Sequence, residues 1–339
     1  MACLLRGHTN LIITDIDFAT GTVRPVTALF IDVTDMITPP PLEPGDKIGI
    51  VTPSGRIEKG ILDVAIGHFE GWGLKVVTGP NIYSAYNQFG GTDDERASDL
   101  QLMLDDAEIR AVICSRGGYG TVRIIDRIDF SRFKSYPKWV VGYSDITVLH
   151  SHIQKNFKIE TLHAPMPAEF SLSGKAPVSS GSVGLLKNAL FGNLYAHVHS
   201  NHPLSRPGKA EGVLTGGNLS VLYSLTGSRS AIDFCGKILF IEDVGEYIYH
   251  IDRMIVTLCR SGVMGSIGGL LVGGMTKMND NAIPFGQTAE EIIAESVDKY
   301  EYPVCFGFPA GHQSENHPLI LGREVVLHVE DSSFSLTYQ

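Results

Sequence analysis

Short apolar strands that each end in a turn of small residues, followed at once by a helix, dominate the first half of this chain. Three such strands are Ile48 to Val51, Ala111 to Cys114 and Trp139 to Val141. Ile57, Ile61, Ala65 and Phe69 recur at helical spacing after the first, and Thr92-Asp93-Asp94-Glu95 has the form of a capping box. Because strands that alternate with helices pair in parallel, this pattern predicts an α/β fold.

The length favours two domains, since 339 residues exceed what one hydrophobic core usually organises. We expect a nucleophile-bearing α/β domain at residues 45–170, a Ser-, Gly- and Pro-rich linker at 171–205, and a smaller α+β domain at 206–339. Residues 1–44 are expected to be an extension that ends in a run of prolines, and we expect residues 1–35 to be dispensable for folding and activity.

Composition excludes several classes of protein. With 27 basic and 37 acidic residues the net charge is −10, so an extended nucleic-acid surface is not expected. The sequence has no apolar stretch long enough for a membrane span and no convincing signal peptide. Its five cysteines are scattered and form no C-x-x-C pair. We therefore expect a cytoplasmic protein without a disulfide framework or a zinc ribbon.

Ser144 stands where the strand Trp139 to Val141 breaks and the next helix begins. Such a turn exposes a serine hydroxyl, and the amide of Asp145 can then point at an oxyanion. The segment departs from G-x-S-x-G because Ile146 follows two positions after the serine. A serine that only caps the helix explains the local sequence equally well.

A serine nucleophile needs a base and an orienting acid. His312 lies in a turn of small residues after the strand Val304 to Phe308, where its side chain can enter a cleft; His150 and His152 are better explained by packing or solvation. Glu242 and Asp243 end the strand Lys237 to Ile241, and either could be the acid. From the residues alone, a capping or salt-bridged pair with Arg253 is the stronger interpretation of these two carboxylates.

Three further clusters of residues could bind a ligand. The run Arg116-Gly-Gly-Tyr-Gly120 follows a strand, but Arg123 stands where a dinucleotide motif needs its third glycine, so Arg123 is better suited to a carboxylate. Gly216-Gly217-Asn218 could line a cleft, although a plain turn explains it well. His197, His199 and His202 are close enough to suggest a metal site, but a surface strand and loop is the favoured interpretation.

Taken together, these segments resemble the LD-carboxypeptidase family of serine peptidases, which includes muramoyltetrapeptide carboxypeptidases and microcin-C immunity hydrolases. The resemblance covers most of residues 45–328, and its motifs are Thr52-Pro-Ser-Gly55, Arg116-Gly-Gly-Tyr-Gly120 with Arg123, Gly142-Tyr-Ser-Asp145, Gly216-Gly-Asn-Leu219, Ile241-Glu-Asp-Val244 with Ile251-Asp-Arg253, and Gly311-His312.

The resemblance implies a flavodoxin-like parallel-sheet domain that carries Ser144 as nucleophile, and a smaller α+β domain that carries Glu242 as acid and His312 as base. Asp145 with Gly117 or Gly118 would form the oxyanion hole. Arg123, Tyr119 and Asn218 would contact the substrate.

The implied reaction releases the terminal D-Ala from the L-centre of diaminopimelate in a murein tetrapeptide during peptidoglycan recycling. It needs no metal or other cofactor, and family members of this type are often cytoplasmic dimers. Two alternatives remain, namely a microcin-type hydrolase that cleaves an aminoacyl nucleotide and a non-enzymatic ligand-binding protein with two α/β lobes.

Overall fold

The computed structural model describes residues 14–16, 23–25, 36–170 and 177–339, in two compact units, 1–35 and 36–339. In the smaller unit, strand β1 (Thr14–Ile16) pairs antiparallel with β2 (Val23–Pro25). The structure divides the chain after residue 35, and not after residue 44 as we expected, because residues 36–44 belong to the larger unit. Within that unit the Ile37 amide donates to the Lys158 carbonyl, and Leu42 is buried in the core.

A six-stranded sheet organises the first half of the larger unit, in the order β13-β7-β6-β5-β3-β4. Its parallel strands are β3 (Lys47–Val51), β4 (Lys75–Thr78), β5 (Ile109–Cys114), β6 (Trp139–Gly142) and β7 (Thr161–His163). This order is the one found in flavodoxin-like folds, in which ligands bind at the carboxyl ends of the strands. The fold class expected from the sequence is therefore confirmed.

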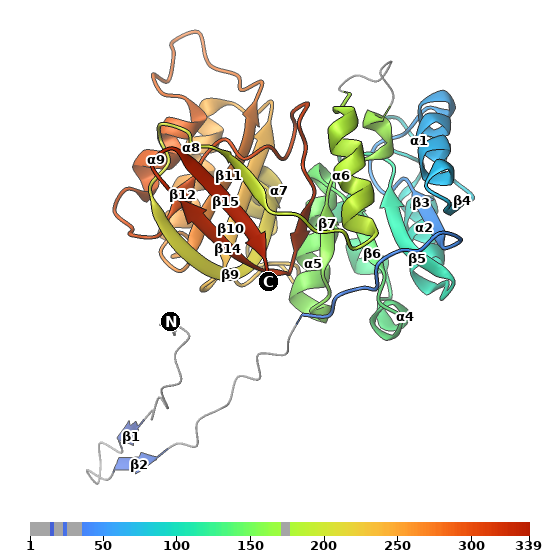
Figure 1. Cartoon of the computed structure of the whole chain (residues 1–339), viewed down its shortest axis with the longest axis horizontal. Coiled ribbons are helices and arrows are strands. Elements are labelled where there is room, and N and C mark those ends of the chain that lie inside the picture. Colours follow the sequence, from blue (N-terminus) through green and yellow to red (C-terminus); the bar gives the residue numbers. More distant parts are fainter. Residues whose placement is uncertain (1–13, 17–22, 26–35, 171–176) are drawn as a thin grey trace. The chain divides into compact units, whose positions relative to one another are not determined.

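Helices cover both faces of this sheet (Figure 1). The buried side chains of α1 (Lys59–Gly71) and α6 (Ser180–Leu190) pack on one face. Those of α2 (Asp93–Asp105), α4 (Ser131–Ser135) and α5 (Thr147–Phe157) pack on the other, with the short α3 (Thr121–Ile124). Three single-turn helices complete this half: η1 (Ile125–Arg127), η2 (Ser144–Ile146) and η3 (Pro167–Glu169).

The second half is built on a seven-stranded sheet, in the order β12-β11-β10-β9-β14-β15-β8. Its strands are β8 (His197–Ser200), β9 (Gly208–Asn218), β10 (Ile238–Val244), β11 (Gly269–Thr276), β12 (Val304–Cys305), β14 (Glu324–Val329) and β15 (Ser333–Tyr338). The helices α7 (Leu219–Ser224), α8 (Ile248–Arg260) and α9 (Ala289–Val297) share one apolar cluster on this sheet.

The expected linker at 171–205 differs from what the structure shows. It contains α6 and β8, and Val183, Leu186 and Leu190 of α6 are buried against the first sheet. Glycine and serine lower helix propensity, but burial of an apolar face outweighs that cost here. The second half also contributes one strand to the first sheet, because β13 (Leu319–Leu321) pairs antiparallel with β7.

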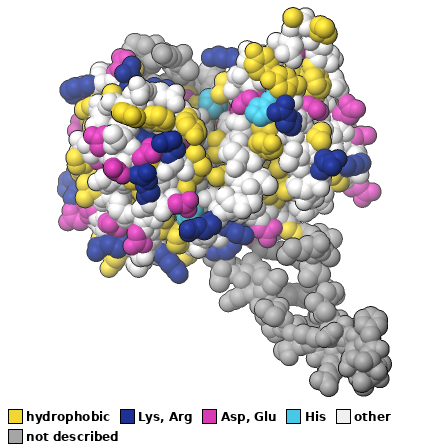
Figure 2. Space-filling view, turned by 180° about the vertical axis from the view of Figure 1, so that it is seen from behind, with side chains coloured by type: hydrophobic (Ala, Val, Ile, Leu, Met, Phe, Trp, Pro, Cys, Tyr) yellow, Lys and Arg dark blue, Asp and Glu magenta, His cyan; other side chains and the backbone are white. Residues whose placement is uncertain are grey.

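The surface carries both signs of charge. On the face shown in Figure 2, acidic and basic side chains are interspersed. None of the helices in the described part of the chain is both long enough and apolar enough to cross a membrane.

Candidate active site

Ser144 lies at the carboxyl end of β6, on a turn with an unusual backbone. Its φ is +63°, a conformation that non-glycine residues adopt rarely and that is often found at functional sites. Gly117 lies directly against it, since a Cβ at Gly117 would come within 2.8 Å of the Ser144 Cβ and 2.9 Å of its Oγ. A strand that ends in such a turn and leads directly into η2 and α5 has the arrangement of a nucleophile elbow.

Asp145 connects the loops that follow three neighbouring strands. Its buried carboxylate accepts hydrogen bonds from the Ser54 hydroxyl after β3, at 2.5 Å, and from the Thr121 amide after β5, at 2.8 Å. The backbone at Asp145 follows β6. One carboxylate therefore holds the Thr52–Gly55 loop, the Arg116–Gly120 loop and the elbow in a common arrangement.

Arg96 supports the same loops from α2. Its side chain is fully buried, and Nη1 donates to the carbonyls of Gly120, at 2.9 Å, and Pro53. Burial lowers the pKa of Arg96, and the neighbouring Asp93 opposes that change. Sequence reasoning missed Arg96, because an arginine on a capped helix gives no sign that it turns inward.

His312 and Glu242 form a hydrogen-bonded pair. The His312 Nδ1 lies 2.7 Å from the Glu242 Oε2, and the His312 amide donates to the same oxygen at 3.2 Å. The Glu242 side chain is completely buried, whereas that of His312 is 20% exposed. Burial lowers the pKa of His312, but the charge and hydrogen bond of Glu242 outweigh it, so the net pKa lies above its usual value.

Gly311 makes room for this pair. A Cβ at Gly311 would lie 2.6 Å from the Glu242 Oε2, and its φ of +101° also favours glycine.

Asn218 holds Glu242 rather than facing a cleft. Its Nδ2 donates to the Glu242 Oε1 at 3.3 Å and to the Asp243 Oδ1 at 3.0 Å, and its Oδ1 caps α7 at the Val221 amide. Asn218 is 4% exposed, so the structure does not place it as the substrate contact that we expected. Nor is Gly216-Gly217-Asn218 a plain turn, because it ends β9 and starts α7.

Asp243, the other candidate acid, does not have His312 as its hydrogen-bond partner. Its carboxylate accepts from Asn218, from the Ser220 amide at 2.9 Å and from its neighbour's amide at Val244. Burial, with the adjacent Glu242, raises the pKa of Asp243 to about 6. The structure therefore distinguishes the two carboxylates, and Glu242 is the one that is hydrogen-bonded to His312.

The two halves meet at Tyr143, the residue before Ser144. Its ring centroid is 4.8 Å from that of His312, and its hydroxyl donates to Glu169. Burial raises the pKa of Glu169 to about 7. A second link joins the domains, since the Asn218 amide donates to the Thr147 Oγ1 at 3.0 Å. Tyr143, Thr147 and Glu169 were not found from the sequence.

Tyr119 lies in the Arg116–Gly120 loop and Arg123 in α3, which follows it, and both side chains are about half exposed. The guanidinium of Arg123 is paired with Asp93, through Nε at 3.0 Å and Nη2 at 2.8 Å. Tyr119 is about half exposed, and its ring lies 6.1 Å from that of Phe89. Arg123 is thus bound to a carboxylate that Arg96 and Arg127 share, whereas the Tyr119 ring is accessible.

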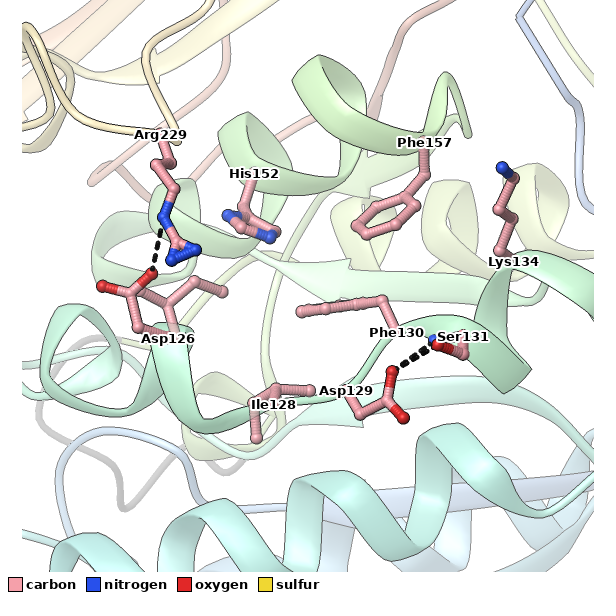
Figure 3. A pocket seen from close by; sticks show the side chains of 10 residues that line it. Asp126, Ile128, Asp129, Phe130, Ser131, Lys134, His152, Phe157 and Arg229 are labelled. Carbon is pink, nitrogen blue, oxygen red and sulfur yellow. Dashed lines mark hydrogen bonds and ion pairs between the residues drawn. The ribbon is translucent and has the colours of Figure 1, made fainter.

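The histidines of α5 have partners in the fold. The His150 Nε2 donates to the Gly142 carbonyl at 2.8 Å, and the His152 Nδ1 is 2.9 Å from the Ser230 hydroxyl. His152 lines a separate pocket with Phe130, Phe157 and the Asp126–Arg229 ion pair, and this pocket does not include Ser144 (Figure 3).

Ser144 lies on an elbow, and His312, which is paired with a buried carboxylate, packs on the ring of the preceding residue, Tyr143. A serine, a histidine and a buried carboxylate gathered in this way are typical of serine hydrolases. Models of the LD-carboxypeptidase N-terminal and C-terminal domains match residues 48–164 and 211–327, respectively. The chain belongs to the LD-carboxypeptidase family, and it is a serine-type enzyme of that family.

Relatives include a probable murein peptide carboxypeptidase of Bacillus subtilis, which is 34% identical over 87% of this chain and 92% of its own length. A murein tetrapeptide carboxypeptidase of Pseudomonas aeruginosa is 27% identical over 83% of this chain and 92% of its own.

Two solved structures share the fold. The muramoyltetrapeptide carboxypeptidase from Oxalobacter formigenes has a TM-score of 0.77 and 25% identity, covering 86% of this chain and 98% of its own. MccF, solved in complex with glutamyl sulfamoyl guanosine, has a TM-score of 0.76 and 22% identity, covering 88% of this chain and 98% of its own.

Proposed function

We propose that this enzyme is a carboxypeptidase that releases the terminal D-Ala from the L-centre of diaminopimelate in murein tetrapeptides, with Ser144, His312 and Glu242 as its catalytic triad. The observation that carries the proposal is the buried Glu242–His312 pair beside the Ser144 turn. The relatives from B. subtilis and P. aeruginosa are named as murein peptide carboxypeptidases, which supports a murein substrate.

In the proposed reaction, the Ser144 Oγ attacks the carbonyl carbon of the scissile amide while its proton passes to the His312 Nε2. Glu242 holds the Nδ1 proton and stabilises the imidazolium that forms. The amides of Asp145 and of Gly117 or Gly118 donate to the oxyanion. The C–N bond then breaks, and His312 gives its proton to the amine of D-Ala as it leaves.

Water completes the cycle. His312 takes a proton from the water, whose oxygen attacks the acyl-enzyme carbonyl, and the proton returns to the Ser144 Oγ as the ester bond breaks. The tripeptide leaves with a new carboxylate. These steps use only groups of the chain and water, so the proposed reaction needs no cofactor.

Mass spectrometry of a muramoyl tetrapeptide ending in D-Ala tests this function. We expect the wild type to release one alanine and Ser144→Ala to leave the peptide intact while still binding it. Ser135→Ala is a matched control, since Ser135 is an exposed serine on α4. Loss of alanine with both Ser144→Ala and the wild type would remove Ser144 from the mechanism.

One observation favours the aminoacyl-nucleotide alternative. Tyr119 presents an exposed aromatic ring on the Arg116–Gly120 loop, where a nucleobase could stack, and Arg123 is already paired with Asp93. An aminoacyl sulfamoyl adenosine offered in the same assay separates the two functions. Cleavage of this compound with the tetrapeptide left intact would replace the murein proposal.

We also propose that the enzyme acts in the cytoplasm as a homodimer, that it binds no nucleic acid, and that it acts in peptidoglycan recycling. These proposals follow the family resemblance. Light scattering of the purified chain tests the dimer, and cell fractionation tests the location.

A further inference from the structure

Three histidines meet at a place that takes no part in the proposed reaction. His197 and His199 project from the same face of the edge strand β8, and His317 lies in the loop that precedes β13. One ring nitrogen from each lies within 4.8 Å of the others. The three therefore converge from two segments that are more than a hundred residues apart in the sequence.

Three buried ring nitrogens of this cluster lack hydrogen-bond partners within the described residues. His197 is 1% exposed, and neither its Nδ1 nor its Nε2 has a partner within the described residues. The buried Nδ1 of His317 has none there either. Leaving a buried polar atom unpaired costs on the order of 1–3 kcal/mol, and native structures normally avoid it. Several such atoms pointing at one place indicate a ligand there.

The surroundings keep these rings ready to act as ligands. Burial lowers the pKa of all three rings and so favours the neutral imidazole, which is the form that binds a metal ion. The His317 Nε2 lies 3.6 Å from a Glu315 carboxylate oxygen, whereas its Nδ1 is buried without a partner among the described residues. The second nitrogen of a metal-binding histidine is commonly directed at a carboxylate.

We propose that His197, His199 and His317 bind one first-row divalent transition-metal ion, Zn²⁺ in the first place. Neutral imidazoles suit Zn²⁺, whereas Mg²⁺ and Ca²⁺ prefer oxygen ligands. Zn–N bonds of about 2.0–2.1 Å require nitrogens about 3.3 Å apart in a tetrahedral site. The part-exposed rings of His199 and His317 close that gap by small side-chain rotations.

The fourth position of the site is open to a water molecule. The buried hydroxyl of Tyr195 also has no partner among the described residues, and its ring lies 4.7 Å from that of His197. It supplies a hydrogen-bonding group for such a water.

The site differs from the one that the sequence suggested, because His202 is not part of it. The His202 Nδ1 accepts a hydrogen bond from the Leu204 amide at 3.2 Å. His317 takes its place, and His317 stands five residues after His312 in the same loop. The metal would therefore attach the loop of the proposed base to an edge strand of the second sheet, which is a structural role.

Metal binding to the full chain tests the proposal. After removal of metals with a chelator, we expect titration calorimetry to show one Zn²⁺ per wild-type chain, and Co²⁺ to give the visible absorption of a tetrahedral nitrogen site. Zn²⁺ should also raise the Tm by about 2–5 °C, because it binds only the folded state, and Mg²⁺ should not.

Variants locate the ion. His199→Ala and His317→Asn should each weaken Zn²⁺ binding more than about 100-fold, and Glu315→Gln should weaken it about tenfold, since outer partners contribute 10–100-fold. His202→Ala and the exposed His328→Ala are matched controls that should bind as the wild type does. His199 and His317 are only partly buried, so these variants should fold.

Three outcomes would overturn the proposal. The first is a wild-type chain that takes up no stoichiometric Zn²⁺. The second is binding by His199→Ala and His317→Asn that is as tight as that of His202→Ala. The third is binding lost in His312→Ala alone, which would place the ion at the proposed catalytic pair. None of these readouts depends on peptidase activity, so failure here leaves the proposed function standing.

Discussion

The two domains hold their shares of the candidate active site by different means. In the first domain, buried polar groups brace the loops, but Ser144 itself is placed by backbone geometry, since its φ is positive and its side chain leaves no room for a Cβ at Gly117. The second uses buried polar groups, because Glu242 is fully buried and bound by His312 and Asn218. The first half should therefore be sensitive to added atoms and the second to removed charge.

The largest effect is expected from removing the charge of Glu242. Glu242→Gln keeps the shape but no longer stabilises the His312 imidazolium, so kcat should fall about 10³- to 10⁴-fold. The pKa of His312 should also fall, since burial then acts without the opposing carboxylate, and the acid limb of the kcat–pH profile should move to lower pH.

Glu246→Gln is a matched control for this variant. Glu246 pairs with His250 at 2.6 Å on the edge of α8, outside the proposed site, so its loss should leave kcat within about twofold. A loss below tenfold in Glu242→Gln would contradict the role of charge in the second domain.

An added methyl group tests the first domain. In Gly117→Ala the new Cβ would clash with the Ser144 side chain, and a displacement of about 1 Å at the reacting atom can cost about 100-fold in rate. We expect kcat to fall by about that factor with a small change in Tm. Gly67→Ala on the exposed face of α1 is the control, since its Cβ would meet nothing within 4 Å. Unchanged kcat in Gly117→Ala would disprove the steric argument.

Glu169 tests whether buried charge matters only in the second domain, because it is a buried carboxylate in the first domain. Its pKa of about 7 exceeds the unfolded value near 4.5, so the folded state binds more protons than the unfolded state between these pH values. Glu169 therefore contributes about 3 kcal/mol to the free energy of unfolding below about pH 4.5. This contribution is lost as the pH rises through about 7.

Urea unfolding at pH 5 and pH 8 measures this effect. Glu169→Gln should gain stability relative to the wild type by up to about 3 kcal/mol over that range, because it carries no titrating group. Parallel pH dependence in both proteins would show that Glu169 titrates normally.

The smallest effect is expected at Arg123. Its exposed pair with Asp93 contributes about 0–1 kcal/mol, and its Nε and Nη2 already donate to that carboxylate, so Arg123→Ala should change KM less than about threefold. A KM increase above tenfold in steady-state kinetics would instead support the substrate carboxylate contact that the sequence suggested.

The alternation of strands and helices predicted the first domain, because hydrophobic periodicity and turn residues depend only on nearby positions in the sequence. The capping box at Thr92 was likewise confirmed, with both of its hydrogen bonds present. The helix α6 was missed since its glycines and serines obscure the apolar face that it buries. The sequence motifs singled out Glu242 and His312, but the choice between Glu242 and Asp243 depends on a contact between residues 70 positions apart.

Supporting residues were harder to find. Arg96, Thr147 and Glu169 act through burial and through partners more than 20 residues away in the sequence, and nothing in their immediate neighbours signals this. In the same way, His317 could not be grouped with His197 before the register of β8 was known.

The strand β13 has a consequence for how the domains could move. His312 lies on the segment between β12, which belongs to the second sheet, and β13, which belongs to the first. No single cut in the chain separates the two sheets. This segment is a strap with one end on each domain, so any opening between the domains would pull on the very loop that carries the proposed base.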